Sequence, residues 1–154
     1  MLAAGFVNDS VVPGVYTLAQ LMAVDPALYA RRYAWCTDLF GGSPDWCISD
    51  GAQWKPVRPF GLQTPTVSGT GAMVLTAMVS APTQVITGVL GVGATLTLSF
   101  ATQYAWKGAR FRTIRNATGL GTVLVNGLGL PLNNWQDNEF DGTAWVQTAS
   151  GGLL

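Results

Sequence analysis

Residues 48–54 read Ile-Ser-Asp-Gly-Ala-Gln-Trp, and residues 139–145 read Glu-Phe-Asp-Gly-Thr-Ala-Trp. Both stretches contain an Asp-Gly pair, two further residues and then a tryptophan. Asp-Gly between strand-like residues is a strong hairpin signal, because a two-residue type I′ turn needs positive φ at both central positions. A tryptophan that begins the returning strand is able to fold over such a turn and cover its apolar neighbours. We therefore expect six residues to shape two equivalent turns: Asp50, Gly51, Trp54, Asp141, Gly142 and Trp145.

The sequence on either side of the first Asp-Gly pair is strand-like. Residues 33–37 are rich in strand formers, residues 41–44 (Gly-Gly-Ser-Pro) turn the chain, and residues 46–49 return it. Residues 54–57 follow as the next strand. Pro56 predicts an edge position for that strand, because proline cannot donate to a central ladder.

Upstream of this hairpin, one stretch has helical character. Residues 17–30 place apolar side chains at helical spacing, Thr17 is a suitable N-cap, and Pro26 ends the first turn or begins another. Residues 1–16 are mixed in character and are interpreted as an extended arm. The helix is therefore expected to be short and peripheral.

Downstream, short strands continue to the end of the chain. Strands are expected at residues 72–79, 84–90, 95–101, 109–115, 122–125 and 144–148. Short strands at intervals of roughly 8–15 residues, separated by Gly, Pro or Asn, are typical of sandwiches and jelly rolls. We predict an all-β fold, namely an antiparallel β-sandwich, jelly-roll-like, with an N-terminal arm and β-hairpin. The expected segments are an arm with a short helix at 1–34, a hairpin module at 35–60 and a sandwich domain at 61–154.

The composition excludes several classes of function. The 154 residues include 8 basic and 8 acidic side chains and no histidine, and 10% of them are charged where roughly 25% is usual. A net charge of zero provides no attraction for nucleic acid or an anionic membrane. Without histidine, a His-based catalytic triad and a His-ligated metal site are both excluded. The protein is accordingly predicted not to be an enzyme and to use no metal or cofactor.

The charged residues flank a long neutral stretch. Residues 59–106 contain no Asp, Glu, Lys or Arg, so a membrane span at 85–101 has to be considered. That segment contains glycines and threonines, and residues 95–100 alternate at the period of a strand. We interpret the neutral stretch as buried β-structure and expect no membrane partner. Because an uncharged surface does little to oppose association, copies of the chain are expected to associate through this stretch.

Two cysteines, Cys36 and Cys47, lie on either side of the Gly-Gly-Ser-Pro turn. A hairpin there would bring them near each other, but a disulfide requires Cα atoms within about 7 Å and a specific register. No secretion signal is recognisable, so two small buried side chains are favoured over a disulfide. The sequence leaves their pairing open.

The acidic residues of the chain allow two kinds of chemistry. Asp50 and Asp141 are candidates for glycosidase carboxylates, but the turn is a sufficient explanation for an aspartate before glycine. Asp137, Asn138 and Glu139 offer oxygen ligands for calcium. The EF-hand spacing is missing, however, and a polar loop of this kind is usually solvated. We therefore expect no catalytic residue and no metal ligand.

Three residues are candidates for contact with a partner. Arg110 and Arg112 alternate on one expected strand and so lie on the same face, where they are able to touch an acidic neighbour. Trp135 lies in an Asn-rich segment interpreted as a loop, a setting in which an exposed indole stacks on sugar rings. Anchoring of a core or an interface is the more common use of tryptophan, and we favour it here.

These features together resemble a module of tailed-bacteriophage structural proteins. In that module a short helical or extended lead enters a strand that ends in Thr-Asp, as at residues 37–38, and a Ser-Asp-Gly-x-x-Trp hairpin closes it, as at residues 49–54. Residues 140–145 are similar to the ends of such proteins, which include tail-fibre and tailspike segments and capsid decoration proteins. The family usually has a Gly-Ala-Arg lead, which residues 108–110 keep, whereas residues 30–32 read Ala-Arg-Arg.

The resemblance covers residues 17–57 and 109–150, and it implies a role in the virion. It implies a capsid decoration (cement) protein, assembled in the host cytoplasm, that stabilises the head by bridging major capsid subunits. The expected partners are the major capsid protein and copies of the chain itself, as a homotrimer, with no nucleic acid. The alternative is a tail-fibre or adaptor protein, or a receptor-binding module of the tail that takes a host glycan.

Overall fold

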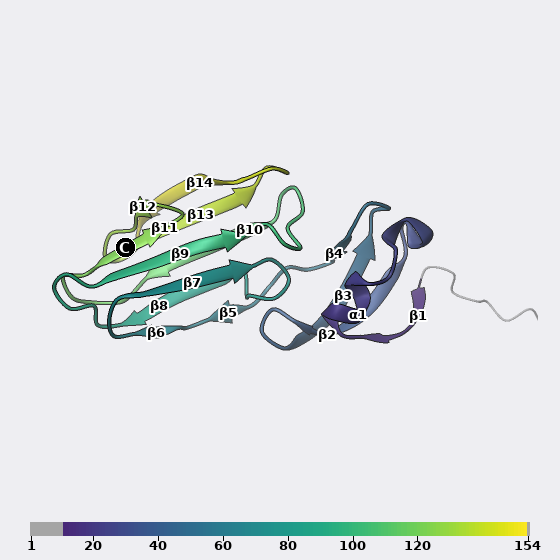
Figure 1. The fold of residues 1–154 in the computed structure, drawn as a ribbon, viewed down its shortest axis with the longest axis horizontal. Helices are drawn as coiled ribbons and strands as arrows, with labels where there is room; N and C mark the ends of the chain where they lie inside the picture. Colours follow the sequence, from purple (N-terminus) through teal and green to yellow (C-terminus); the bar gives the residue numbers. More distant parts are fainter. Residues whose placement is uncertain (1–10, 154) are drawn as a thin grey trace, which may run out of the picture. The chain divides into compact units, whose positions relative to one another are not determined.

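The structure of the chain, a computed structural model, describes residues 11–153. These residues form fourteen strands, one short α-helix and one 3₁₀-helix, so the predicted all-β fold is confirmed (Figure 1). They divide into two compact units, with the boundary between Arg58 and Pro59. The first ten residues of the predicted arm lie outside the described residues. Segments 1–34 and 35–60 share one sheet, because a strand of the arm pairs with the hairpin.

The first unit is a four-stranded sheet with two short helices in one of its connections. Its elements are β1 (Val11–Tyr16), α1 (Leu18–Met22), the 3₁₀-helix η1 (Pro26–Tyr29), β2 (Tyr33–Leu39), β3 (Ser43–Ser49) and β4 (Trp54–Pro56). The strand order is β1-β2-β3-β4, with β1 parallel to β2 and the two following pairs antiparallel. β4 lies at the edge of the sheet, as Pro56 predicts.

The helices begin where the sequence supplies caps. The Thr17 side chain accepts a hydrogen bond from the Gln20 amide at 3.2 Å, and the Gln20 side chain accepts one from the Thr17 amide at 2.8 Å. This capping box satisfies two amides at the start of α1. Asp25 caps η1 with its side chain, and Pro26 occupies the first helical position. The helix predicted over 17–30 is therefore two short helices with a break before Pro26.

One side of this sheet is buried. α1 packs on β2, and it buries Leu18 and Leu21. Ala34 and Cys36 on β2 and Cys47 on β3 have no solvent exposure. Both cysteines are free thiols, in keeping with the preference for two buried side chains over a disulfide.

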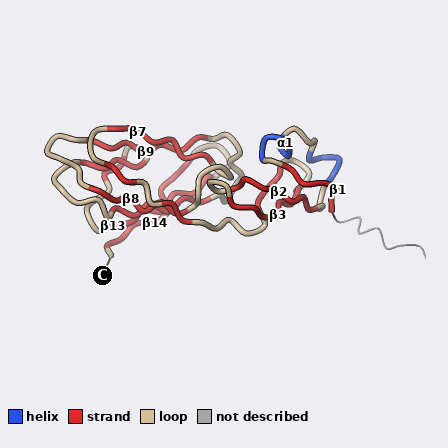
Figure 2. Tube along the Cα trace, turned by 90° about the horizontal axis from the view of Figure 1, so that it is seen from below, coloured by secondary structure: helices blue, strands red, loops and turns tan. Residues whose placement is uncertain are grey.

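The second unit contains two mixed sheets. Its strands are β5 (Leu62–Gln63), β6 (Thr66–Val67), β7 (Gly71–Thr76), β8 (Thr83–Gly88), β9 (Thr95–Ala101), β10 (Arg110–Arg115), β11 (Thr122–Val125), β12 (Leu128–Gly129), β13 (Asn134–Phe140) and β14 (Trp145–Gly152). The larger sheet has the order β14-β13-β10-β8-β5, with β6 also paired to β8, and the smaller sheet has the order β12-β11-β9-β7. Figure 2 shows the two sheets of this unit as two layers.

From β6 to β11 the chain alternates between these two sheets, one strand at a time. Each strand pairs in parallel with the strand two places along the chain: β6 with β8, β8 with β10, β7 with β9, and β9 with β11. The chain therefore winds in coils, and each coil adds one strand to each sheet. Parallel neighbours usually require a helical crossover, and here a strand of the opposite sheet makes the crossover instead. The predicted antiparallel, jelly-roll-like pairing is therefore wrong for these central strands.

Glycines at the corners let successive coils approach each other. Gly88, at the end of β8, has a φ of 103°, and a Cβ there would lie 2.1 Å from the carbonyl oxygen of Val67. Gly119 repeats this arrangement one coil later, with a φ of 92° and 2.2 Å to the carbonyl oxygen of Leu90. Glycine is thus required at both corners. The last coil is closed by antiparallel strands, β12 on β11 and β13 on β10.

One apolar core fills the space between the two sheets. Its buried members all belong to the second unit: Leu75, Ala77, Ile86, Leu90, Leu96, Leu98, Ala109, Phe111, Ala117, Val123, Val125, Leu130, Phe140 and Trp145. The ring of Phe100 lies 5.3 Å from that of Phe111 and 5.2 Å from that of Trp145, measured between centroids. Much of the neutral stretch 59–106 is therefore core and strand of this unit. No helix in residues 11–153 is long and apolar enough to span a membrane.

The sheet of the first unit and the larger sheet of the second unit share one plan. β1-β2-β3-β4 and β8-β10-β13-β14 each consist of one parallel pair followed by two antiparallel pairs. The registers also agree. Ile48 and Glu139 each lie two residues before the aspartate of an Asp-Gly pair, and they lie opposite Tyr33 and Arg110 respectively. The main difference is the segment 116–133, with β11 and β12, which lies between β10 and β13. The repeated Asp-Gly motif thus belongs to a duplicated sheet.

Candidate functional site

The two Asp-Gly loops have the same hydrogen bonds. Each connects two strands through four residues, so the predicted two-residue type I′ turn is wrong. Positive φ occurs at the glycines alone, 91° at Gly51 and 108° at Gly142. The aspartate closes the loop with its side chain, which accepts two loop amides, at 2.9 Å each for Asp50 and at 2.7 and 2.8 Å for Asp141. This geometry accounts for both aspartates as turn residues.

The tryptophan after each loop is buried and hydrogen-bonded. The indole N–H of Trp54 donates to the carbonyl of Val24 at 3.0 Å, and that of Trp145 donates to the carbonyl of Ala101 at 3.0 Å. Trp54 is 3% exposed and Trp145 is 7% exposed. An apolar ring with one polar atom suits this task, because it fills the core and satisfies a backbone acceptor. These two rings therefore anchor the fold and do not form a binding surface.

The two loops differ in their charges. Lys55 lies 2.5 Å from the carboxylate of Asp50, and together with the loop amides it lowers the pKa of Asp50 to about 2. The loop amides also lower the pKa of Asp141, where Val146 takes the place of Lys55. Both shifts favour the ionised carboxylate, which accepts the loop amides. A glycosidase acid needs the opposite shift.

The predicted partner contacts lie together on the outer face of β10 and β13. Arg110 donates to Glu139 at 2.7 Å, and Arg112 donates to both carboxylate oxygens of Asp137 at 2.7 Å. The guanidinium of Arg112 also lies 4.6 Å from the centroid of the Trp135 ring. The interaction with Asp137 raises the pKa of Arg112. Both arginines thus have acidic neighbours within their own sheet.

The setting of Trp135 also differs from the expected loop. Trp135 lies in β13, opposite Gly151 of β14, and a Cβ at Gly151 would lie only 3.1 Å from the ring. With Arg112 on the ring as well, Trp135 packs within the sheet. Asn138 is fully buried between the two outward-facing acidic residues of β13, so this segment is a strand and not a solvated calcium loop. No cluster of metal-binding side chains occurs among the described residues.

The corresponding face of the first unit is apolar. It carries Tyr33 and Trp35 from β2 and Trp46 and Ile48 from β3, and we call these four residues the aromatic face. Trp35 and Trp46 lie opposite each other, with ring centroids 5.1 Å apart and planes at 69°. None of the four is buried, and Tyr33 is 36% exposed. Because strand residues alternate in direction, the buried cysteines occupy the other side of the same strands.

Equivalent positions of the second unit carry charges in place of these rings. The cross-strand pairs correspond as Tyr33–Ile48 with Arg110–Glu139 and Trp35–Trp46 with Arg112–Asp137. One scaffold thus presents two ion pairs in one unit and two apolar pairs in the other. Ion pairs suit a face in contact with water, whereas a cluster of rings that are not buried marks a surface that a partner covers.

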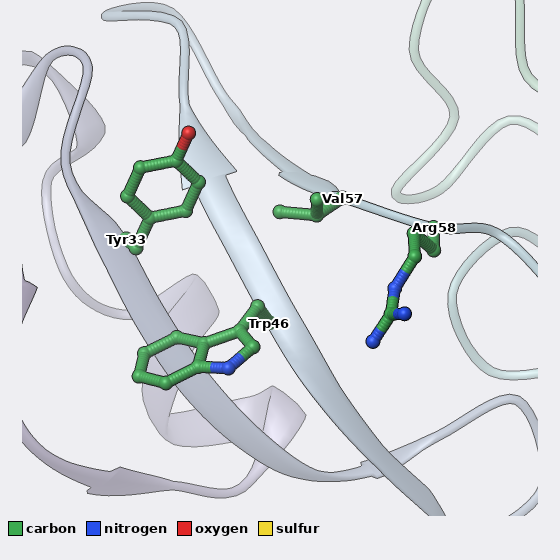
Figure 3. Close-up of a pocket in the computed structure, with 4 residues that line it drawn as sticks. All are labelled: Tyr33, Trp46, Val57 and Arg58. Carbon is green, nitrogen blue, oxygen red and sulfur yellow. The ribbon is translucent and has the colours of Figure 1, made fainter.

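A groove opens beside the aromatic face (Figure 3). It has a volume of about 330 Å³ and is lined by Tyr33, Trp46, Val57 and Arg58. The guanidinium of Arg58 is exposed and lies 3.6 Å from the buried carboxylate of Asp45. The groove therefore has apolar walls and one cationic group at its rim. This combination suits an apolar side chain or a ring that carries a hydrogen-bond acceptor.

The two thiols on the buried side of the sheet are not accessible. Their hydrogen bond lowers the pKa of Cys36 and, together with burial, raises the pKa of Cys47. A reactive thiolate needs access to its substrate, and both residues have no solvent exposure. The pair therefore serves packing.

The aromatic face was not among the predicted sites, although the sequence contains a signal for it. In residues 33–35 and 46–48 the first and third positions are large and apolar, and the middle position is small. In the corresponding residues 110–112 and 137–139 the first and third positions are charged. The pattern becomes informative once the two copies are set in register, which requires the strand pairing. Comparison of the chain with protein-family models, curated proteins and solved structures finds no match.

Proposed function

We propose that this chain is a structural protein of a tailed-phage virion, without catalytic activity, that attaches through its aromatic face. The observation that carries the proposal is the exchange of two cross-strand ion pairs for two apolar pairs on equivalent faces of the duplicated sheet. Apolar rings that are not buried at these positions favour association over solubility. A partner that covers the aromatic face would explain why apolar pairs stand where the second unit has ion pairs.

The aromatic face has the properties of an interface anchor. Tryptophan and tyrosine dominate the binding free energy of many protein interfaces. Trp35 and Trp46 already pack edge to face, so little side-chain freedom is lost on binding. Full burial of one large apolar side chain contributes about 1.5–3 kcal/mol. Each copy would thus bind the virion with modest affinity. Many bound copies together would stabilise the particle strongly.

Capsid decoration is the type of virion protein that we favour. The two hairpin sheets occupy the regions in which the sequence resembles phage structural modules. The polar residues considered for chemistry are occupied in turns and ion pairs. The partners would be the major capsid protein and other copies of the chain. Bridging of neighbouring capsid subunits by buried apolar area would then resist the pressure of the packaged genome.

The proposal is tested by exchanging the aromatic pair for the ion pair of the second unit. The double substitution Trp35→Arg and Trp46→Asp installs the residues found at Arg112 and Asp137, which the same scaffold accommodates. The fold should therefore persist, as circular dichroism would show. Virions assembled with W35R/W46D should carry at least tenfold fewer copies of the protein than virions with the wild type, counted by quantitative mass spectrometry.

A matched control alters the second unit instead. Arg112→Gln with Asp137→Asn removes the ion pair at the equivalent position and should leave incorporation unchanged. Incorporation of W35R/W46D at the level of the wild type would overturn the attachment surface. Absence of the wild-type protein from purified particles would overturn the virion role itself.

The groove beside Tyr33 and Trp46 favours a second candidate, a tail-fibre or adaptor protein that binds a host glycan. Its rings and the guanidinium of Arg58 would allow stacking on a sugar and a hydrogen bond to its hydroxyls. Copy number and location separate the two candidates. Hundreds of copies on the head support decoration, and a handful at the tail supports the adaptor. Binding to a glycan array that is lost on Trp46→Ala would also favour the tail.

A further inference from the structure

The edge strands of the described sheets are protected, with one exception. A free edge exposes unpaired backbone groups, and natural proteins protect it with prolines, bulges, charges or short strands. β1 contains Pro13 and a register shift, β4 has three residues and ends at Pro56, and β5 and β6 are two-residue strands on either side of Pro65. β12 has two residues, and β14 has a register shift opposite Asp137 and Asn138. The exception among these strands is β7.

β7 has the features of an edge that pairs. It is the outermost strand of the smaller sheet and pairs with β9 over six consecutive positions without a register shift. Its sequence, Gly-Ala-Met-Val-Leu-Thr, contains no charge and no proline. Val74, near its centre, is 62% exposed. A regular, uncharged and partly apolar edge strand is the kind that takes up another strand.

The contacts of Thr76 show which backbone N–H and C=O groups of β7 are unpaired. The carbonyl of Thr76 accepts the amides of Val79 and Ser80, and its own amide donates to the Ser80 hydroxyl, so these groups point away from β9. Backbone groups alternate in direction along a strand. The N–H and C=O groups of Ala72 and Val74 therefore face the open side of the sheet, where no other described strand lies.

A groove also lies along this edge. This groove of about 570 Å³ is lined by residues of β5, β7 and β8, among them Leu62, Met73 and Leu75. Leu62 is 60% exposed. The buried Gln84 in this groove donates to the side chain of Gln63 at 2.8 Å, so its amide is already engaged. The open end of the coils thus offers a groove with polar and apolar lining residues beside an unpaired strand.

We propose that β7 pairs antiparallel with β7 of a second copy of this chain, so that the two smaller sheets form one continuous sheet across a two-fold axis. Such a contact is self-complementary, because Ala72 and Val74 of each copy donate to and accept from the other. With the axis perpendicular to the sheet, Met73 and Leu75 face the same side in both copies, and the two cores meet. β7 carries no charge, so it offers no ion pair to a charged strand of another protein. A second copy of β7 is equally uncharged and therefore a suitable partner.

This inference goes beyond the proposed function and changes the expected symmetry. The sequence predicts a homotrimer joined through the neutral stretch 59–106. An edge strand that pairs antiparallel with its own copy closes at two. The aromatic face belongs to the first unit, so the two surfaces are independent of each other.

The test places charges on the edge of the full-length chain. Ala72 and Val74 are exposed. Lysine at these positions copies the charge that natural proteins place on edge strands to prevent pairing. The wild type should sediment as a dimer over a concentration series, and A72K/V74K should raise the dimer Kd at least tenfold with an unchanged circular dichroism spectrum. Val92→Lys makes the same change at an 84% exposed position of the neutral stretch and should leave the dimer intact.

Hydrogen exchange provides a second measurement that does not depend on a variant. In the wild type, exchange of the Ala72 and Val74 amides should slow as the protein concentration rises. A monomer at every concentration, a trimer, or a dimer that A72K/V74K leaves intact would overturn the proposal. So would dissociation by W35R/W46D, because it would place self-association on the aromatic face. Dimers that fail to attach to virions would overturn only the proposed function.

Discussion

Arg31 precedes β2 with a φ of 66°, in the left-handed region that favours glycine. Its amide donates to the carbonyl of Ser49 at 2.8 Å, and in the second unit the amide of Gly108 donates to the carbonyl of Phe140 at 2.8 Å. Arg31 therefore occupies the position of Gly108. The sequence motif instead compares residues 30–32 with residues 108–110, which sets Ala30 opposite Gly108. The hydrogen bonds show that the counterpart of Gly108 is Arg31.

Replacement of Arg31 by glycine is expected to stabilise the protein. A left-handed conformation costs a non-glycine residue about 1–2 kcal/mol, and the greater freedom of glycine in the unfolded chain offsets about 0.5–1 kcal/mol. The side chain is exposed, so little packing is lost. R31G should raise the Tm by about 2 °C, measured by circular dichroism. Gly108→Ala, at a φ of 90° in open space, should lower it, and a lower Tm for R31G would contradict the expectation.

The hairpin loop of the first unit makes its stability depend on pH. Lys55 and the loop amides lower the pKa of Asp50 from 3.8 to about 2 in the folded state. A lowered pKa stabilises the fold above the unfolded value, and this contribution is lost as the pH falls from about 4 to about 2. The carboxylate is more than a third exposed, so water screens the pair, and the expected loss is about 0.5 kcal/mol.

Asp50→Asn is the variant that isolates this contribution. The amide oxygen still accepts the loop N–H groups, but the charge is gone, so the stability should change less with pH in D50N than in the wild type. Urea unfolding between about pH 5 and about pH 2.5 measures the difference. Asp141→Asn is the matched control, since Val146 there takes the place of Lys55, and its effect should be smaller. Equal pH dependence of D50N and the wild type would contradict the assignment.

Among the elements, those with apolar alternation could be predicted. The strands expected at 95–101 and 122–125 are β9 and β11 with the same bounds. For β13 the sequence predicts a polar loop, because most of its residues are Asn, Gln, Asp and Glu around one tryptophan. Arginines of β10 neutralise its outer acids, and its inner amides are buried. These compensations come from a distant strand, so the local sequence does not contain them.

The winding of the second unit could not be predicted for a related reason. Successive coils share no repeated sequence motif, and what they share is the stacking of backbone on backbone. Gly88 and Gly119 mark the corners where this stacking is closest, but in the sequence they are two glycines among nineteen. Parallel pairing therefore became evident only from the register of the strands.

At the scale of the whole molecule, the second unit is expected to fold alone. All members of its buried core lie between Leu75 and Trp145, and its sheets contain no strand of the first unit. A fragment of residues 59–154 should therefore unfold cooperatively, with the near-ultraviolet signal of packed aromatic rings around Trp145. Circular dichroism in urea checks this expectation. A fragment without a cooperative transition would show that its core depends on the first unit.

The candidate site belongs to this largest scale as well. The sequence placed possible contacts at Arg110, Arg112 and Trp135, which the structure brings together in one sheet and pairs among themselves and with acidic neighbours. The aromatic face is defined by the pairing of β2 with β3 and by its difference from the equivalent pair β10 and β13. A surface of this kind is a property of strand pairing, and it is invisible to a search for motifs along the chain.

The duplicated sheet also indicates where the first unit would accept new sequence. In the second unit, the connection from β10 to β13 accommodates residues 116–133 with two further strands. The first unit makes the equivalent connection with Phe40, Gly41 and Gly42 between β2 and β3. A foreign peptide inserted at Gly41-Gly42 would repeat an enlargement that this sheet already tolerates. That turn is thus a natural place for a tag or a displayed epitope.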